Sequence, residues 1–388
     1  MKLETVDERR VLALLQRLIS IESVNPLLDP TGSGEEEIGR FLREALIRRG
    51  FEVHEQTVQP GRANIIGRRH GDGRGPSLLL NGHMDTVGIS SMDIPPLTPA
   101  LRDGRILGRG SADMKSGIAA ILEAADILAA SNVSLAGDLI LAFVVDEEYT
   151  SLGTQKLLET VRADAAIVCE PTDLRIGLAH KGFVWGKVDV EGRAAHGSRP
   201  AEGIDAIVAA GRFLGALDDF GRENLSGRHH PLLGCPSVHA SLIRGGREMS
   251  TYPDHCEIRL ERRTLPGETA SDFTAEITTV IDRLHTADPT FKARYTTLLE
   301  RPPLESPAEH PLVSALAKAH RAATGRPHEI AGISWWMDTA LISDAGVPAV
   351  AYGPQGDGLH GARESVDFES VLTTAAVLAR TALGYCGG

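Results

Sequence analysis

The sequence predicts an α/β protein whose mostly parallel sheet carries helices on both faces, with a smaller α+β domain inserted into it. Short apolar runs alternate with helical stretches over roughly the first 170 residues. The middle of the chain changes to two-residue alternation, and the first pattern returns after the segment PPLESP (302–307). Alternating strands and helices are typical of a parallel sheet, so the middle segment is predicted to be an insertion.

The N-terminal part is predicted to form two helices and a strand. Apolar residues recur at helical spacing from Val11 to Leu18. The string from Ser33 to Glu36 has the form of a capping box, which predicts that a second helix begins near Ser33 and stops at Gly50. Residues 51–58 alternate between apolar and polar, as a half-buried strand does.

The rest of the larger domain follows from the same patterns. Strands are predicted at 77–80, 138–145 and 165–169, and helices at 112–130 and 150–160. Beyond the insertion, helices are predicted at 308–324, 336–346 and from 366, with a strand at 347–353.

The inserted segment is predicted to run strand, helix, strand, strand, helix, strand. These elements are expected at 181–192, 201–219, 235–244, 254–261, 268–285 and 290–298, with a glycine-punctuated loop at 221–234. Such an order is typical of a small sheet with two helices on one face. The predicted boundaries are therefore 1–179 and 299–388 for the larger domain and 180–298 for the insertion.

Composition and charge exclude several classes of function. The 388 residues include 40 Lys and Arg against 52 Asp and Glu, which gives a formal net charge of −12. This balance argues against a nucleic-acid binder, whose affinity comes mostly from cations on phosphates, and against a polybasic membrane surface. No apolar run approaches the ~20 residues that span a bilayer.

A cytoplasmic location is predicted. The first ten residues, MKLETVDERR, lack the apolar stretch of a secretory signal. The four cysteines lie far apart and form no CxxC pair, which favours reduced thiols over a disulfide framework or a cysteine–zinc site.

Polar clusters follow four predicted strands. NGHMDTVG, DEEYTS, CEPT and GPQGDGLHGARE each come directly after an apolar run, and a fifth cluster, GRGSADMKSG, opens a helix. Ligands of open α/β sheets bind outside the carboxyl ends of the strands, so these clusters are expected at one edge. Their candidate residues are His83, Asp85, Asp113, Glu147, Glu148, Glu170 and His360.

Such a gathering of acids predicts a divalent metal site. Crowded carboxylates raise one another's pKa unless a cation neutralises them, and imidazole with carboxylate suits Zn²⁺, Co²⁺ or Mn²⁺. Taken singly, each cluster has a plainer interpretation, such as a structural histidine or a solvated acidic turn. A GxGxxG string at 356–361 is a weak dinucleotide signal, because no βαβ unit can follow it.

With these motifs in order, the sequence resembles the acetylornithine deacetylase and succinyl-diaminopimelate desuccinylase family, relatives of aminoacylase and glutamate carboxypeptidase. The strings LLLNGHMDTV, GRGSADMKSGIAA, VVDEEYTSLGT and CEPT carry the resemblance, which runs from about residue 10 to 380. It implies two divalent ions, zinc first and cobalt or manganese as alternatives. It implies that His83 and Glu170 bind one metal and Glu148 and His360 the other, while Asp113 bridges both.

The resemblance also implies catalytic roles. Glu147 is the expected general base, and Asp85 is expected to hold the His83 ring through its other N–H. The peptide after Asp113 is expected to be cis. His196 of the insertion is expected to stabilise the oxyanion, often across a homodimer that forms through this lid domain.

The sequence indicates the residues that bind the substrate less clearly than the metal ligands. Arg263 is a candidate for a substrate carboxylate, with an ordinary salt bridge as the alternative. Ser250 stands where relatives carry a substrate-binding Asn. Glu364 either orients His360 or caps the next turn, and the tryptophans at 335 and 336 either line a substrate pocket or belong to the core.

The expected function is metal-dependent hydrolysis of an amide, with removal of the acyl group from an N-acyl amino acid as the first choice. A dipeptidase or carboxypeptidase of the same clan is the alternative. A metal-binding protein without turnover is a third possibility, but no proposed base or ligand is replaced. A dinucleotide-dependent oxidoreductase lacks a glycine-rich motif after the first strand.

Overall fold

The computed structural model describes residues 3–387 and divides them into two compact units. The first unit runs to Leu178 and also contains Ser306–Ala331 and the chain from Met337 onward. The second unit contains Ala179–Glu305 and Gly332–Trp336. The predicted insertion, 180–298, lies wholly within the second unit, while residues 1, 2 and 388 of the predicted larger domain lie outside the described residues.

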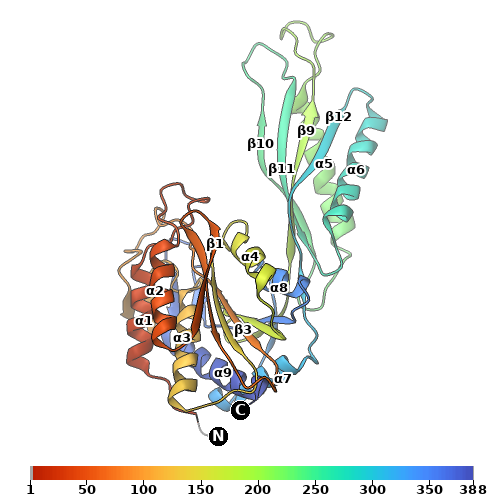
Figure 1. The fold of residues 1–388 in the computed structure, drawn as a ribbon. Helices are drawn as coiled ribbons and strands as arrows, with labels where there is room; N and C mark the ends of the chain where they lie inside the picture. Colours follow the sequence, from red (N-terminus) through yellow and green to blue (C-terminus); the bar gives the residue numbers. More distant parts are fainter. Residues whose placement is uncertain (1–2, 388) are drawn as a thin grey trace. The chain divides into compact units, whose positions relative to one another are not determined.

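A mixed sheet forms the centre of the first unit (Figure 1). Its strands run in the order β1–β2–β6–β3–β7–β15–β8. The inner strands β6, β3, β7 and β15 are parallel, and the pairs β1–β2, β2–β6 and β15–β8 are antiparallel. The bounds are β1 (Glu52–Gln59), β2 (Arg62–Arg69), β3 (Leu78–His83), β6 (Leu139–Val144), β7 (Ala165–Val168), β8 (Ile176–His180) and β15 (Ala349–Ala351).

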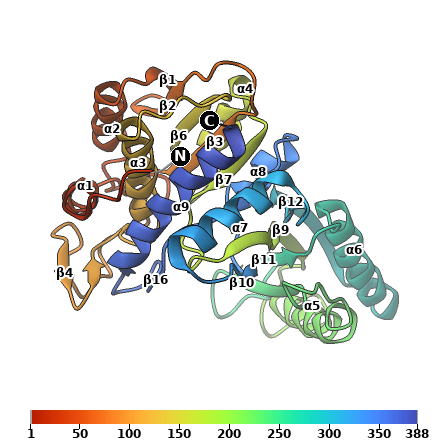
Figure 2. The same cartoon turned by 90° about the horizontal axis from the view of Figure 1, so that it is seen from below.

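Helices cover both faces of this sheet, as predicted (Figure 2). On β3, Leu78 and Leu80 join the core beneath one set of helices: α1 (Glu8–Ser20), α2 (Glu36–Arg48), α3 (Lys115–Ala130), α7 (Pro311–Thr324) and α9 (Phe368–Cys386). Leu79 points to the other face, where α4 (Leu152–Thr160) and α8 (Thr339–Asp344) contribute Leu157 and Ile342. Because both faces are buried, the inner strands read as continuous apolar runs.

The capping-box prediction at Ser33 was wrong. Helix α2 begins at Glu36, and its N-cap Glu35 makes no side-chain cap bond. The carboxylate of Glu35 instead receives two hydrogen bonds from the buried guanidinium of Arg62, at 2.7 and 2.5 Å. The predicted stop was confirmed, because Gly50 follows the helix with a φ of +74°.

A small antiparallel sheet, β16–β17–β5–β4, was not predicted. Its strands are short: β4 (Ala100–Arg102), β5 (Arg105–Leu107), β16 (Gly356–Asp357) and β17 (Ser365–Asp367). The GxGxxG string begins in β16 and continues into the loop that returns directly to β17, which excludes a βαβ dinucleotide motif there. The sheet therefore brings the segment around His360 next to the segment that leads to Asp113.

The second unit has the predicted β-α-β-β-α-β order. Its sheet, β10–β11–β9–β12, is antiparallel and packs against two helices through apolar residues such as Val188, Phe213 and Phe273. The bounds are β9 (Gly182–Glu191), α5 (Ala206–Phe220), β10 (Ser237–Gly245), β11 (His255–Thr264), α6 (Ala270–Ala287) and β12 (Lys292–Arg301). The predicted loop at 221–234 begins as a turn of π-helix, η1 (Gly221–Leu225).

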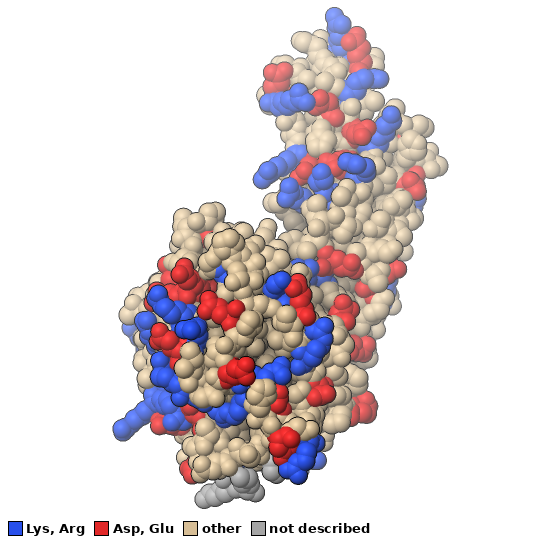
Figure 3. All heavy atoms as spheres, viewed as in Figure 1, with Lys and Arg blue, Asp and Glu red and all other residues tan. Residues whose placement is uncertain are grey.

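The chain passes between the units at four points: within β8, directly after β13 (Leu304–Glu305), within β14 (Ile330–Ile333) and after Trp336. No helix in residues 3–387 is long and apolar enough to span a bilayer. On the face drawn in Figure 3, acidic and basic side chains are interspersed.

Candidate metal centre

The candidate residues sit at the carboxyl ends of neighbouring parallel strands. His83 is the last residue of β3, so this strand is longer than the predicted 77–80. Glu147 and Glu148 follow β6, and Glu170 follows β7. Since β3 pairs with β6 on one side and with β7 on the other, the three strand ends share one edge of the sheet.

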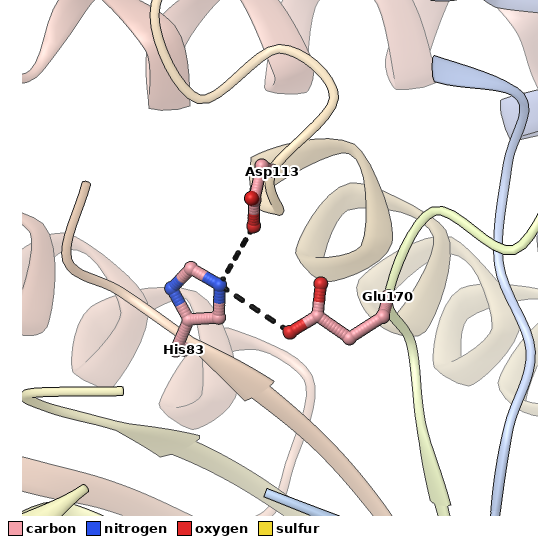
Figure 4. Close-up of side chains that lie close together, drawn as sticks. All are labelled: His83, Asp113 and Glu170. Carbon is pink, nitrogen blue, oxygen red and sulfur yellow. Dashed lines mark hydrogen bonds and ion pairs between the residues drawn. The ribbon is translucent and has the colours of Figure 1, made fainter. Parts of the chain in front are cut away.

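Three side chains form a first trio: His83, Asp113 and Glu170 (Figure 4). The Nε2 atom of His83 lies 3.0 Å from Oδ1 of Asp113 and 3.4 Å from Oε1 of Glu170. All three residues are largely buried. Their polar atoms therefore converge on one point where a single cation can be held.

Asp113, Glu148 and His360 form a second trio. The Nε2 atom of His360 lies 2.9 Å from Oε2 of Glu148 and 3.3 Å from Oδ2 of Asp113. Asp113 thus presents one carboxylate oxygen to each histidine. The structure brings together all five residues that the sequence singled out as ligands, with Asp113 between the two groups.

Glu364 fixes the segment that carries Asp113. Its carboxylate accepts hydrogen bonds from the backbone amides of Gly110, Ala112 and Asp113 at 2.8–3.0 Å, and Arg109 donates to it at 2.8 Å. The two alternatives considered for Glu364, orienting His360 or capping the next turn, were both wrong. The peptide bond between Asp113 and Met114 is cis, as the resemblance implied.

Asp85 contacts the second ring nitrogen of His83, as expected, but through its backbone oxygen. The Nδ1 atom of His83 lies 2.9 Å from the backbone oxygen of Asp85 but 3.6 Å from its carboxylate. The carboxylate instead accepts the backbone amides of Glu147 and Glu148, each at 3.1 Å. Asp85 therefore links the His83 strand end to the loop that carries the two glutamates.

Burial and repulsion from neighbouring acids shift the three glutamates of the site toward protonation, whereas hydrogen bonds from His360 and His83 lower the pKa of Asp113. Burial is the largest cause of the raised pKa of Glu147 and Glu170, and it raises the pKa of Glu148 to about 7. Hydrogen bonds to Asp113 and Glu148 raise the pKa of His360 to about 10. Burial opposes the charge of His83, but Glu170 and Asp113 outweigh it and raise the pKa of His83 well above its usual value.

This donor set fits divalent cations. Buried carboxylates of like charge need compensation, and imidazole with carboxylate oxygen is the ligand chemistry of zinc, cobalt and manganese. The Oε1 atom of Glu148 is buried and has no hydrogen-bond partner among the described residues, so it is free to bind a cation. The arrangement has the capacity for two ions that share Asp113.

Glu147 stands beside this centre without belonging to either trio. Its Oε2 atom lies 4.0 Å from Nε2 of His83, and about a tenth of its side chain is exposed. A carboxylate in this position, beside the candidate cation site but outside both trios, is suited to exchange protons with a reacting water.

Three predicted site residues, His196, Ser250 and Arg263, belong to the second unit. The exposed His196 ring shares a hydrogen bond of 2.8 Å with the Ser198 hydroxyl. Ser250 is exposed, and its backbone oxygen accepts from Gly197. Arg263 forms an ion pair with Glu261 at 2.7 Å.

The tryptophans at 335 and 336 differ in their contacts. Trp336 packs edge-on against Phe183, with ring centroids 5.9 Å apart, and its indole N–H donates to the Pro302 oxygen at 2.9 Å. Trp335 is 37% exposed. The core interpretation therefore fits Trp336 better than Trp335.

Several buried polar residues around the centre escaped the sequence analysis. Asp338 is almost fully buried and accepts a hydrogen bond of 2.5 Å from the Thr154 hydroxyl. Burial raises the pKa of Asp338 to about 7, and its charge contributes to the raised pKa of Glu147. Asn25 and Asp146 are also fully buried. The Asn-Pro dipeptide at 25–26 signals a turn, but nothing in the sequence indicates what Asn25 contacts.

Comparison with known proteins gives consistent results. The sequence pattern of peptidase family M20/M25/M40 matches residues 79–384. An acetylornithine deacetylase from Myxococcus xanthus is 31% identical over 90% of this chain and 92% of its own length. The N-formyl-4-amino-5-aminomethyl-2-methylpyrimidine deformylase of Bacillus subtilis is 27% identical over 98% of this chain and 95% of its own.

Solved structures share the fold. A dinuclear metal-binding peptidase from Bacillus subtilis superposes with a TM-score of 0.75 at 17% identity, covering 97% of both chains. The match extends over both units, because it leaves only 3% of this chain uncovered.

Proposed function

Because the chain belongs to peptidase family M20/M25/M40, we propose that it hydrolyses the amide bond of an N-acyl amino acid with the aid of two divalent metal ions. One observation carries the proposal: Asp113 lies between His83 and His360, each of which also approaches a buried glutamate. The named relatives act on N-acyl compounds or on peptides, and both are linear amides.

The proposed ligands fall into two groups. His83 and Glu170 hold one ion, Glu148 and His360 hold the other, and Asp113 binds both. Ions held there supply Lewis acidity, which makes water more acidic and polarises a carbonyl group. Zinc is the first choice of metal, and cobalt and manganese are the alternatives.

Glu147 is the proposed general base. It takes a proton from the attacking water and returns it to the leaving nitrogen, so that the amine departs neutral. The raised pKa of Glu147, caused chiefly by burial, suits a group that must both accept and donate a proton. Asp85 and Glu364 keep the surrounding loops in place through their bonds to backbone amides.

The choice between a deacylase and a peptidase is testable with substrates. We expect the metal-loaded enzyme to give its highest kcat/KM with an N-acetyl, N-formyl or N-succinyl amino acid rather than with a dipeptide or an N-blocked peptide. The measurement is a panel that compares these classes at equal metal content. A dipeptide with the highest kcat/KM would support the peptidase alternative, and no hydrolysis of any amide would refute the proposed function.

We also propose that the second unit mediates a homodimer and that His196 stabilises the oxyanion. The resemblance of the sequence to its family implies this role, and the exposed ring of His196 is accessible to a substrate. His196→Ala is expected to lower kcat by about 10²–10³-fold, the usual cost of removing one oxyanion donor, without loss of metal. His229→Ala, an exposed histidine of the same unit, is the control. A fully active monomer in analytical ultracentrifugation would contradict the dimer.

The proposed substrate is a small molecule, and the proposed location is the cytoplasm. The four cysteines support a reducing compartment, since all are free thiols and three are buried.

A further inference from the structure

We propose that Asn25 is a positioning residue whose side-chain amide sets the loop that carries Glu147 and Glu148. The inference rests on the proposed function, because it assigns Asn25 a role through the proposed base and a proposed ligand. Asn25 itself touches neither glutamate side chain in the contacts described. It acts through two buried carboxylates, Asp85 and Asp146.

The amide of Asn25 joins these carboxylates directly. Its Nδ2 atom donates to Oδ2 of Asp85 at 2.8 Å and to Oδ1 of Asp146 at 3.0 Å. Its Oδ1 atom accepts the backbone amide of Leu27 at 3.0 Å. This third bond fixes the orientation of the group, because a reversed amide would turn its oxygen toward two carboxylates and its nitrogen toward a donor.

Each of these two carboxylates also binds the loop that carries Glu147 and Glu148. Asp85 accepts the amides of Glu147 and Glu148 at 3.1 Å. Asp146 accepts the Thr150 hydroxyl within the same loop, and its backbone lies in the left-handed region with a φ of +67°. A residue other than glycine keeps this backbone conformation only when surrounding contacts stabilise it. The hydrogen bonds to the Asp146 carboxylate therefore help to maintain this turn.

The charges around Asn25 explain why a neutral hydrogen-bond donor lies between Asp85 and Asp146. The Arg62 guanidinium pairs with Glu35 at 2.5 Å and lies 3.3 Å from Asp146. It therefore faces more than one buried acid. The Asp85 oxygen that accepts from Asn25 also accepts the Glu148 amide, and the Asp146 oxygen also accepts from Arg62, so the two N–H groups of Asn25 add a second donor to each. A buried carboxylate that loses one of its donors is less well compensated, which is unfavourable.

The backbone of Asn25 is anchored to the same strand end as the site. The segment pairs in parallel with the residues after β3, through bonds of 2.9 Å from Asn25 N to Thr86 O and from Thr86 N to Ser23 O. Asn25 thus has a fixed position relative to Asp85. Supporting groups that are fixed in this way hold a site in its working geometry.

The test compares Asn25→Asp, Asn25→Ala and Asn25→Ser with the wild-type protein. Asn25→Asp keeps the shape of the side chain but replaces its NH₂ group by an oxygen, so both N–H donors are lost. Asn25→Ala removes the whole amide group. Asn25→Ser keeps a single donor, its hydroxyl group. The readouts are Co²⁺ affinity and the visible spectrum of the Co²⁺ form, followed by kcat and KM on the best substrate. Folding is checked by circular dichroism.

We expect folded Asn25→Ala to lose about 10–100-fold in Co²⁺ affinity or in kcat, the usual cost of removing a group that orients metal ligands, with KM little changed. Asn25→Asp should lose at least as much, although it fills the same space, and Asn25→Ser should lose less. A role in packing alone would give the opposite order, since the isosteric Asp variant would then resemble the wild type.

Thr381 offers a control of the same buried, polar kind. Its fully buried hydroxyl donates to the Val377 oxygen within helix α9, at 2.8 Å. Thr381→Ala and Thr381→Val are expected to keep wild-type Co²⁺ affinity and kcat. Equal losses in the Thr381 and Asn25 variants, or a wild-type result for Asn25→Asp, would overturn the proposal.

Failure of this inference differs from failure of the proposed function. A wild-type protein that binds Co²⁺ but hydrolyses no amide would refute the function, while the Co²⁺ affinities would still decide the role of Asn25. An active wild type with unchanged Asn25 variants would refute the inference alone.

Discussion

Glu147→Gln is expected to lower kcat by about 10²–10⁴-fold or more, the usual contribution of a general base, while the protein keeps its metal. The amide of Gln cannot accept the proton of water, yet it has almost the shape of the carboxylate. Glu147 lies outside both groups of proposed ligands, 4.0 Å from the nearest His83 nitrogen, so its loss leaves each group complete. The variant should therefore lose activity while its metal content stays at the wild-type level.

The measurement pairs steady-state kinetics with elemental analysis of the same sample. Glu159→Gln, an exposed residue of α4, is the matched control and should behave as wild type. Full activity of Glu147→Gln would remove Glu147 as the base. Loss of metal together with activity would make it a ligand instead.

Asp113→Ala is expected to lose both ions and all measurable activity. Each histidine faces a different oxygen of this carboxylate, at 3.0 and 3.3 Å, so one substitution removes a ligand from both groups. Two protein ligands would remain for each ion, one fewer than the three that catalytic zinc sites usually have. The measurement is the number of ions retained per chain after dialysis.

Asp344→Ala serves as the control for this variant, because Asp344 is exposed at the end of α8. It should retain the wild-type metal content. If Asp113→Ala kept two ions, the carboxylate would not bridge them and the proposed centre would be wrong.

The sheet and the convergence of its strand ends could be predicted from local patterns. Unbroken apolar runs indicate strands buried on both faces, and β6, β7 and the first half of β3 are runs of this kind. Once these strands are parallel neighbours, the residues that follow them must meet at one edge. The order of the strands alone therefore predicts that His83, Glu148 and Glu170 lie close together.

The supporting contacts could not be predicted, because they join residues far apart in sequence. Glu364 accepts amides some 250 positions away, and Asn25 reaches Asp146 across 121 positions. The start of helix α2 could not be predicted for the same reason. The sequence there has the residues of a capping box, but Glu35 forms a buried ion pair with the distant Arg62, and the helix begins at Glu36.

Strand β2 was missed for a related reason. Residues 62–69 carry arginines at both ends and a glycine within, which hides the alternation of a strand. The Pro-Gly pair at 60–61 is typical of a turn, but the pairing with β6 that buries Ile65 and Ile66 is a tertiary effect.

The most direct test of the account is an anomalous difference map from crystals grown with Zn²⁺. The account predicts two peaks on either side of the Asp113 carboxylate, one beside His83 and Glu170 and the other beside Glu148 and His360. A map without a peak at Asp113, or with a single ion that leaves His360 unbound, would contradict the two-metal centre.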